Sequence, residues 1–205
     1  MLLTSSTIIE FVERECNSGL ALMGFFYFDF RDEDKQSRRN LLTSLLFQLA
    51  AESDLCSDFL SDLYLEHAAG SRQPSDSVLT ECLTDILRLP QQPTTYIILD
   101  ALDECPNTFR LPTARDEVLD LLEELVGLNL PNLRICVTSC PEVDIKAILE
   151  PLASQHVSIH DQRGQMQDII DYISAYIDSD SHMKRWRRED KQLVIDTLSA
   201  RVDGM

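Results

Sequence analysis

The sequence has 205 residues, with 18 Lys and Arg against 35 Asp and Glu, which gives a formal net charge of −17. This length fits one large domain, and 44% hydrophobic with 26% charged residues excludes a disordered chain and a fibre. The negative charge argues against nonspecific nucleic-acid binding, because clustered Lys and Arg hold a phosphate backbone. It also disfavours an anionic membrane surface. We therefore expect neither a nucleic-acid nor a membrane partner.

The N-terminal segment and the cysteines favour a cytoplasmic protein. Residues 1–15 lack a basic start and soon turn acidic, so they do not fit a secretory signal. No apolar run reaches the roughly 18 residues of a membrane span. The cysteines lie in apolar stretches without a C-x-x-C pair, which favours free, reduced, mostly buried thiols over disulfides or a zinc site. They are Cys16, Cys56, Cys82, Cys105, Cys136 and Cys140.

Hydrophobic periodicity predicts the elements of the first half of the chain. Residues 5–16 predict a helix that ends near Gly19, with no strand before it. Residues 20–30 form a nearly continuous apolar run, which is typical of a strand buried on both faces. Leucines at helical spacing over residues 41–49 predict the next helix. A second amphipathic helix follows over residues 55–64, with Leu55, Phe59, Leu60, Leu63 and Tyr64 on its apolar face.

The second half alternates strands and helices. A helix over residues 78–87 begins after Ser75 and stops at Pro90, and a short strand over 96–99 ends on Asp100. We then expect a helix over 118–126, a strand over 134–138, a helix over 145–152, a weaker strand over 157–159 and two helices from Met166 onward. This alternation predicts an open α/β sheet with parallel strands and right-handed crossovers.

We expect two parts, an α/β domain over residues 1–163 and the start of a helical extension over 164–205. Inside the extension, residues 184–188 form a basic cluster in an otherwise acidic chain. The cluster fits either a solvated loop or helix start, or a contact surface for an acidic neighbour.

Acidic residues follow the strand over residues 96–99. In an open α/β sheet, ligands bind at the carboxyl ends of the strands. Asp100 stands at such an end, with Asp103 and Glu104 three and four positions later. P-loop NTPases place a first carboxylate so that it holds magnesium, and a later one so that it orients or deprotonates the attacking water. The alternative is a solvated acidic turn. Thr138 and Ser139, at the end of the next strand, are expected beside this site.

These segments, in this order, resemble NACHT domains of the fungal NLR-like kind, which include heterokaryon-incompatibility and nephrocystin-like proteins. The resemblance covers nearly the whole chain, and its collinearity is more specific than any single motif. The segments that carry it are Phe26-Tyr27-Phe28-Asp29-Phe30, Lys35-Gln36, Leu41-Leu42-Ser44-Leu45, Ile98-Leu99-Asp100-Ala101-Leu102-Asp103-Glu104-Cys105, Arg134-Ile135-Cys136-Val137-Thr138-Ser139, Ile195-Asp196-Thr197-Leu198 and Asp203-Gly204-Met205.

The resemblance implies a STAND-type P-loop NTPase that works as a switch, closed with ADP and oligomeric with ATP. Asp100 then matches the Walker B aspartate that positions magnesium. Asp103 and Glu104 match the acidic pair that orients the hydrolytic water, and Thr138, Ser139 and Cys140 match the nucleotide-facing strand end. The expected cofactors are ATP or ADP with magnesium. The expected partners are proteins or further copies of the chain, and relatives often carry ankyrin or WD40 repeats downstream.

Two departures from the family pattern bear on activity. The sequence contains no G-x-x-x-x-G-K-[ST] loop, whose amides and lysine cradle the phosphates. In the family that loop directly precedes the helix that residues 2–15 resemble, so the first strand is also expected to be missing. Its absence leaves unpaired sheet edges beside residues 134–138 and 157–159. Cys140 stands where relatives commonly carry an Arg, and a thiol lacks the charge and the forked donors of a guanidinium.

Three hypotheses remain open from the sequence. The first is a partial NACHT-type signalling NTPase domain, truncated at both ends and unable to hydrolyse ATP by itself. The second is a non-enzymatic interaction module that keeps the fold without nucleotide binding. The third is a gene-model fragment without a separate function. An α/β hydrolase is more distant, because no G-x-S-x-G motif is present.

Overall fold

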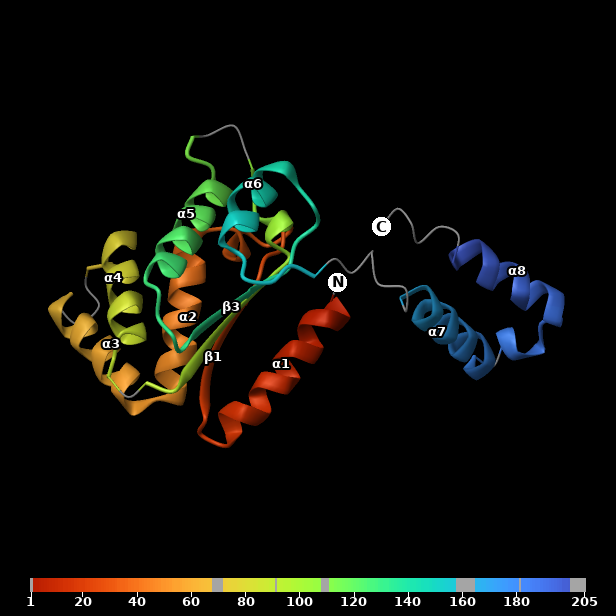
Figure 1. The fold of residues 1–205 in the computed structure, drawn as a ribbon, viewed down its shortest axis with the longest axis horizontal. Helices are drawn as coiled ribbons and strands as arrows, with labels where there is room; N and C mark the ends of the chain where they lie inside the picture. The colour runs from red at the N-terminus through yellow and green to blue at the C-terminus, as the bar shows by residue number, and fades with distance from the viewer. Residues whose placement is uncertain are drawn as a thin grey trace. The chain divides into compact units, whose positions relative to one another are not determined.

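The structure, a computed structural model, describes residues 2–67, 72–90, 92–107, 111–157, 165–180 and 182–199. The chain divides into two compact units, Met1–Ala153 and Ser154–Met205, which are described separately below (Figure 1). Within the described residues, no helix combines the length and the apolar character that a membrane crossing requires.

A parallel sheet of three strands forms the centre of the first unit. The strands are β1 (Ala21–Tyr27), β2 (Thr94–Asp100) and β3 (Leu133–Val137), in the order β1-β2-β3. Gly24 of β1 pairs with Ile97 of β2, and Ile98 of β2 pairs with Cys136 of β3. The three strands lie within the predicted apolar runs or extend them by one or two residues. The predicted class, an open α/β fold with parallel strands, is confirmed.

Helices cover both faces of this sheet. On one face lies α1, while α2 and α5 lie on the other (Figure 1). The helices of the first unit are α1 (Leu2–Asn17), α2 (Arg38–Glu52), α3 (Asp54–Glu66), α4 (Asp76–Leu87), α5 (Ala114–Gly127) and α6 (Val143–Leu152), with short helical turns η1 (Glu33–Lys35) and η2 (Leu102–Glu104). Each predicted helix of this unit is therefore present.

The leucines of α2 form the middle of the larger core. Leu42, Leu45 and Leu49 are fully buried against the face of the sheet opposite α1. The fit at Gly24 in β1 is close, because a Cβ there would lie 2.8 Å from Cδ2 of Leu45 and would force that side chain to shift. Ser37 caps the helix by accepting a hydrogen bond from the Asn40 N–H. The predicted helix over 41–49 is thus the main partner of the sheet on this face.

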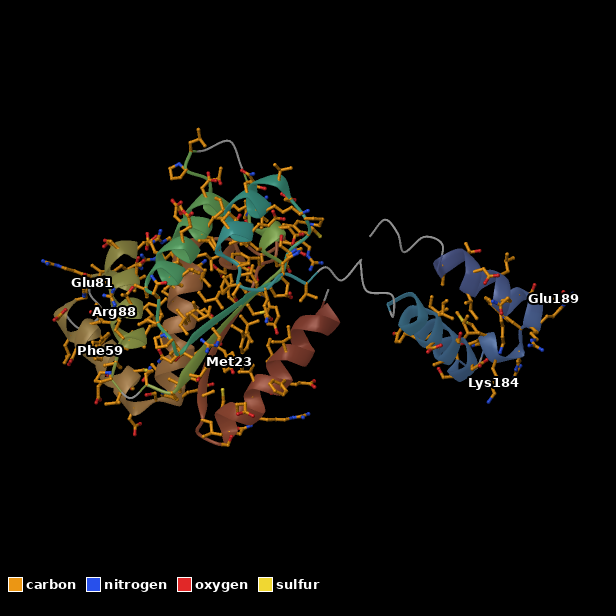
Figure 2. All side chains as sticks on the ribbon, in the orientation of Figure 1. Met23, Phe59, Glu81, Arg88, Lys184 and Glu189 are labelled. Atoms are coloured by element: carbon orange, nitrogen blue, oxygen red, sulfur yellow. The ribbon has the colours of Figure 1, made fainter. Side chains whose placement is uncertain are left out.

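The predicted apolar face of α3 is only partly buried. Leu55 and Tyr64 are exposed, and Phe59 lies at the outer surface of the unit (Figure 2). Cys56 is the fully buried residue of the helix, while Leu60 and Leu63 pack partly against the core. Because α3 lies against α2 and α4 and not on the sheet, only a narrow stripe reaches the interior. Periodicity thus predicted the helix, but only Leu60 and Leu63 of its apolar face pack against the core.

The two outer edges of the sheet differ. The Phe28 N–H bonds to the Asp100 carbonyl, so alternate residues of β1 bond β2 and the others point outward. Side chains of α2 occupy that outer edge: Gln48 bonds both the N–H and the C=O of Phe25 at 2.9 and 2.8 Å, and Glu52 accepts from the Met23 N–H at 2.9 Å. The edge of β1 is therefore closed to a further strand.

The edge of β3 is not closed in this way. The backbone N–H of Thr95 donates to the Asn132 carbonyl, and the backbone N–H of Thr138 donates to the Leu99 carbonyl. Because alternate residues of β3 bond β2, the backbone groups of Ile135 and Val137 point away from β2. None of the described strands lies on that side of β3. An open row of donors and acceptors of this kind is a template for another strand.

The second unit contains α7 (Gln165–Ser179), the turn η3 (Met183–Arg185) and α8 (Arg188–Ser199). Ile177 of α7 is buried, and Lys191 of α8 pairs with Asp178 at 2.8 Å. The two helices predicted beyond Met166 are present. The basic cluster forms η3 and the start of α8 and is exposed, as Lys184 shows in Figure 2. Of the weak strand predicted over 157–159, Val157 is exposed and not in a strand, and residues 158 and 159 lie outside the described residues.

Substitution of Gln48 tests the closed edge of β1. Gln48→Met keeps the length of the side chain and leaves the N–H and C=O of Phe25 without their partner. We expect a loss of about 1–3 kcal/mol in the free energy of unfolding, measured by urea denaturation. The matched control is Glu81→Gln on the exposed side of α4 (Figure 2), which should stay within about 0.5 kcal/mol of the parent. Equal stabilities of the two variants would contradict this account of the edge.

Candidate functional site

Asp100 is the last residue of the central strand β2. Its side chain is buried, with 3% of its surface exposed, on the face of the sheet that α1 covers. On that face Tyr27 pairs with it across β1, and Cys136 lies on β3. Burial and the Asp100 carboxylate both raise the pKa of Tyr27 and of Cys136. The sheet thus places one buried carboxylate at its carboxyl edge.

Thr138 links Asp100 to the end of β3. The Thr138 hydroxyl donates a short hydrogen bond to Oδ1 of Asp100 and accepts one from the Ala101 N–H at 3.1 Å. Its backbone N–H donates to the Leu99 carbonyl at 2.9 Å. Ala101 itself has φ 56° and ψ 47°, the left-handed conformation, which costs an alanine roughly 1–2 kcal/mol. The predicted neighbours Asp100 and Thr138 are therefore in direct contact, and this contact fixes the sharp turn after β2.

Asp103 lies against Cys140. Oδ1 of Asp103 accepts a hydrogen bond from the Cys140 N–H at 2.8 Å. The hydrogen bond that the Cys140 thiol donates to the Asp103 carboxylate is the main reason that the pKa of this thiol is raised, with smaller contributions from burial and from the charges of Asp103 and Glu142. All six cysteines lie in the described residues and are free, and Cys140 alone among them is exposed. The second pair of predicted site residues is thus also in contact.

Glu104 and Ser139 bond other groups than Asp100 and Thr138 do. Oε2 of Glu104 accepts from the Phe30 N–H at 3.4 Å, which ties the turn after β2 to the loop after β1. The Ser139 hydroxyl donates to the carbonyl of Cys140 at 2.7 Å. Glu104 thus holds the loop after β1, whereas the Ser139 hydroxyl bonds the adjacent residue.

Arg115, at the start of α5, connects the loops that follow β2 and β3. It is 4% exposed and donates to the carbonyls of Asp103 at 2.7 Å and of Cys105 at 3.0 Å. Its Nη1 pairs with Glu142 and, at 3.1 Å, with Asp144. Leaving one such buried carbonyl without a partner costs about 1–3 kcal/mol. Sequence reasoning missed this residue.

The magnesium prediction for Asp100 rests on a single carboxylate. Among the described residues, no group of three or more His, Cys, Asp and Glu could hold a metal ion. A hard carboxylate oxygen suits magnesium, which keeps several waters and takes its remaining ligands from substrate phosphates. The donor set therefore fits an ion that arrives with a nucleotide, and does not fit a metal held by protein side chains alone.

Substitution of Thr138 tests its contact with Asp100. Thr138→Val keeps the shape of the side chain but removes the hydroxyl that bonds both the carboxylate and the Ala101 N–H. We expect a loss of about 1–3 kcal/mol in unfolding free energy. Thr138→Ser, which keeps the hydroxyl, should lose clearly less. If Ser and Val destabilise the chain equally in denaturant titrations, the hydroxyl does not hold the turn.

The pKa of Cys140 reports its contact with Asp103. Because the carboxylate raises this pKa, Asp103→Asn should lower it and increase the thiolate fraction at a fixed pH. Iodoacetamide should then modify Cys140 faster, and its rate profile should move to lower pH. Mass spectrometry of the Cys140 peptide measures the rate, and buried Cys82 provides the internal control. An unchanged profile would mean that the two side chains do not interact in solution.

One comparison with known proteins identifies a family. The sequence profile described as nephrocystin 3, N-terminal, matches residues 3–140, which is more than half of the chain and includes all three strands. The chain has no significant match among curated proteins or among solved structures. The matched region contains Asp100, Asp103 and Glu104 and ends at Cys140. The chain therefore belongs to the nephrocystin 3 N-terminal family.

Proposed function

We propose that the first unit belongs to a NACHT-type nucleotide switch of the fungal NLR-like kind. It is the part of the switch that holds the magnesium ion. In this proposal Asp100 is the Walker B aspartate, and Asp103 and Glu104 are the acidic pair that follows it. The chain binds ATP or ADP with magnesium only when a phosphate-binding loop accompanies it, and it does not hydrolyse ATP by itself. The setting is a cytoplasmic signalling protein that acts through protein partners or further copies of itself.

The position of Asp100 is the observation that carries this proposal. A buried carboxylate at the tip of the central strand of a parallel sheet lies where α/β folds bind their ligands. Thr138 fixes its orientation through a hydrogen bond to one oxygen. A solvated acidic turn, the alternative to a magnesium site, does not require a buried carboxylate or a neighbouring hydroxyl aimed at it.

The open edge of β3 gives further support. Ile135 and Val137 direct backbone groups toward the side on which the resemblance expects the strand with the phosphate-binding loop. The helix α1 runs back along the sheet, so its N-terminal end lies near the carboxyl edge (Figure 1). A helix N-terminus favours phosphate groups through its free N–H donors and its dipole. Both features fit a loop between an added strand and α1.

Side-chain chemistry supports the proposed inability to hydrolyse ATP. Cys140, at the position where relatives carry an Arg, offers no positive charge, and its raised pKa keeps it a neutral thiol near pH 7. An arginine at a transferring phosphoryl group contributes about 10³–10⁵ in rate. The Asp103 carboxylate against the Cys140 amide would also repel a terminal phosphate. Magnesium offsets part of this repulsion but does not replace a lysine and a nest of amides.

Calorimetry on the chain and on one extended form tests the proposal. Titration of the chain with magnesium-ADP or magnesium-ATP should give dissociation constants weaker than about 1 μM, equivalent to about −8.2 kcal/mol, with ATP turnover at the buffer background. An N-terminal extension that supplies a strand and a G-x-x-x-x-G-K-[ST] loop should tighten binding. Asp100→Asn in the extended form should weaken the magnesium-dependent binding about tenfold or more, equivalent to ~1.4 kcal/mol.

Two matched variants make the outcome decisive. The extended form with the loop Lys changed to Ala should lose the gain in nucleotide affinity. This variant separates phosphate binding from mere stabilisation of the sheet. Glu81→Gln in the extended form should bind as the parent does, because Glu81 lies on the exposed side of α4. If Asp100→Asn binds magnesium-nucleotide as tightly as its parent, Asp100 is not the Walker B residue. If no form binds at millimolar nucleotide, the proposal is wrong, and the interaction module and the gene-model fragment remain as hypotheses.

A further inference from the structure

Arg115 contacts both loops that follow the strands carrying the predicted site. Its Nη2 and Nε donate to the carbonyls of Asp103 and Cys105 in the loop after β2. Its Nη1 pairs with Glu142 in the loop after β3 and with Asp144 in α6. The backbone N–H of Arg115 donates to the carbonyl of Pro106 at 3.2 Å. One side chain thus makes hydrogen bonds to three different segments.

The planar guanidinium suits this arrangement better than any other side chain. It carries five N–H donors in a fixed fork, so it bonds carbonyls on one side and carboxylates on another at the same time. Lys at the same place keeps the charge but has a single flexible ammonium. The Arg115 side chain is 5% exposed, whereas the side chains of Glu142 and Asp144 are 45% and 33% exposed. The ion pairs therefore hold a half-exposed loop against a buried anchor.

We propose that Arg115 is a positioning residue that couples the loop after β2 to the loop after β3 and so holds Asp103 against Cys140. The Asp103 carbonyl bonds Arg115 while the Asp103 carboxylate bonds the Cys140 amide. Cys140 is in turn two residues from Glu142, which Arg115 pairs with directly. Two loops that lie 37 residues apart in sequence at Asp103 and Cys140 are thus joined at two points.

The inference rests on the proposed function in one respect, which is that Asp103 is a residue of the nucleotide site. The coupling itself is a statement about the two loops and has a readout that does not involve a nucleotide. A movement of either loop in the proposed switch would have to break or shift the contacts of Arg115. The side chain is therefore the place where the positions of Asp103 and of the β3 loop are set together.

Arg115→Met in the full chain separates this role from general stability. If the loops separate, Cys140 loses Asp103, and the pH profile of its iodoacetamide modification moves to lower pH, in the direction expected for Asp103→Asn. If the loops stay in place, removal of a nearby cation leaves the carboxylates of Glu142 and Asp144 without its charge. That change raises a thiol pKa or leaves it unchanged. The sign of the shift thus distinguishes coupling from a mere change in charge.

Arg115→Lys and Arg38→Met are the matched variants. Arg115→Lys keeps the charge without the fork, so its Cys140 profile should lie between those of the parent and of Arg115→Met. Arg38 also bridges helices, and its acceptors Thr80, Glu117 and Glu124 lie in α4 and α5, not in the two loops. Arg38→Met should therefore lower stability and leave the Cys140 profile unchanged. All profiles are measured well below the denaturation midpoint, with circular dichroism confirming the folded state.

The outcomes separate this inference from the proposed function. A Cys140 profile that shifts to lower pH in Arg115→Met but not in Arg38→Met supports the coupling, whether or not the chain binds magnesium-ATP. An unchanged or upward-shifted profile in a folded Arg115→Met overturns it. Nucleotide binding without the shift would leave the proposed function standing and remove Arg115 from the site. Hydrogen exchange at the Cys140 amide should rise in the variant that shifts, because Asp103 accepts from that N–H.

Discussion

The pairing of β2 with a strand on each side is the constraint on which the rest of the first unit depends. A strand with neighbours on both edges and helices on both faces is largely shielded from water, so Ile97, Ile98 and Leu99 are all buried. A polar residue is tolerated only where the strand ends and other groups can bond it. Asp100 takes that place, with Thr138 from the next strand as its hydrogen-bond donor. The buried strand and the carboxylate at its tip are two consequences of one arrangement.

The elements of the fold could be predicted because each depends on a local pattern. Continuous apolar runs mark the strands, and leucines at helical spacing mark α2. The buried face of α3 could not be predicted in the same way, since burial depends on which neighbour covers the helix. Leu55 is exposed because α3 packs on other helices, whereas the equally apolar Leu45 lies against the sheet. Closure of the β1 edge by Gln48 likewise depends on how α2 lies over that strand.

The residues of the candidate site also differ in how far the sequence predicts them. Asp100 and Thr138 follow directly from strand ends in a parallel sheet, so sequence alone brings them together. Arg115 lies in a polar stretch and resembles an ordinary surface residue of a helix start. One signal was present: Arg115 is three and four positions before Val118 and Leu119, so it continues the buried stripe of α5. A basic residue on an apolar stripe indicates a buried cation with acidic or carbonyl partners, but it does not identify them.

The charges at the carboxyl edge decide what a phosphate would meet there. Arg115 is the one buried basic side chain among the described residues, yet its donors are already used by Glu142, Asp144 and two carbonyls. Its charge is therefore matched by two carboxylates and is not available to a ligand. A polyphosphate at this edge has to bring magnesium and meet a further cation or a set of amides. In the proposed nucleotide site, the positive counterpart of these carboxylates therefore has to arrive with the ligand or with another strand.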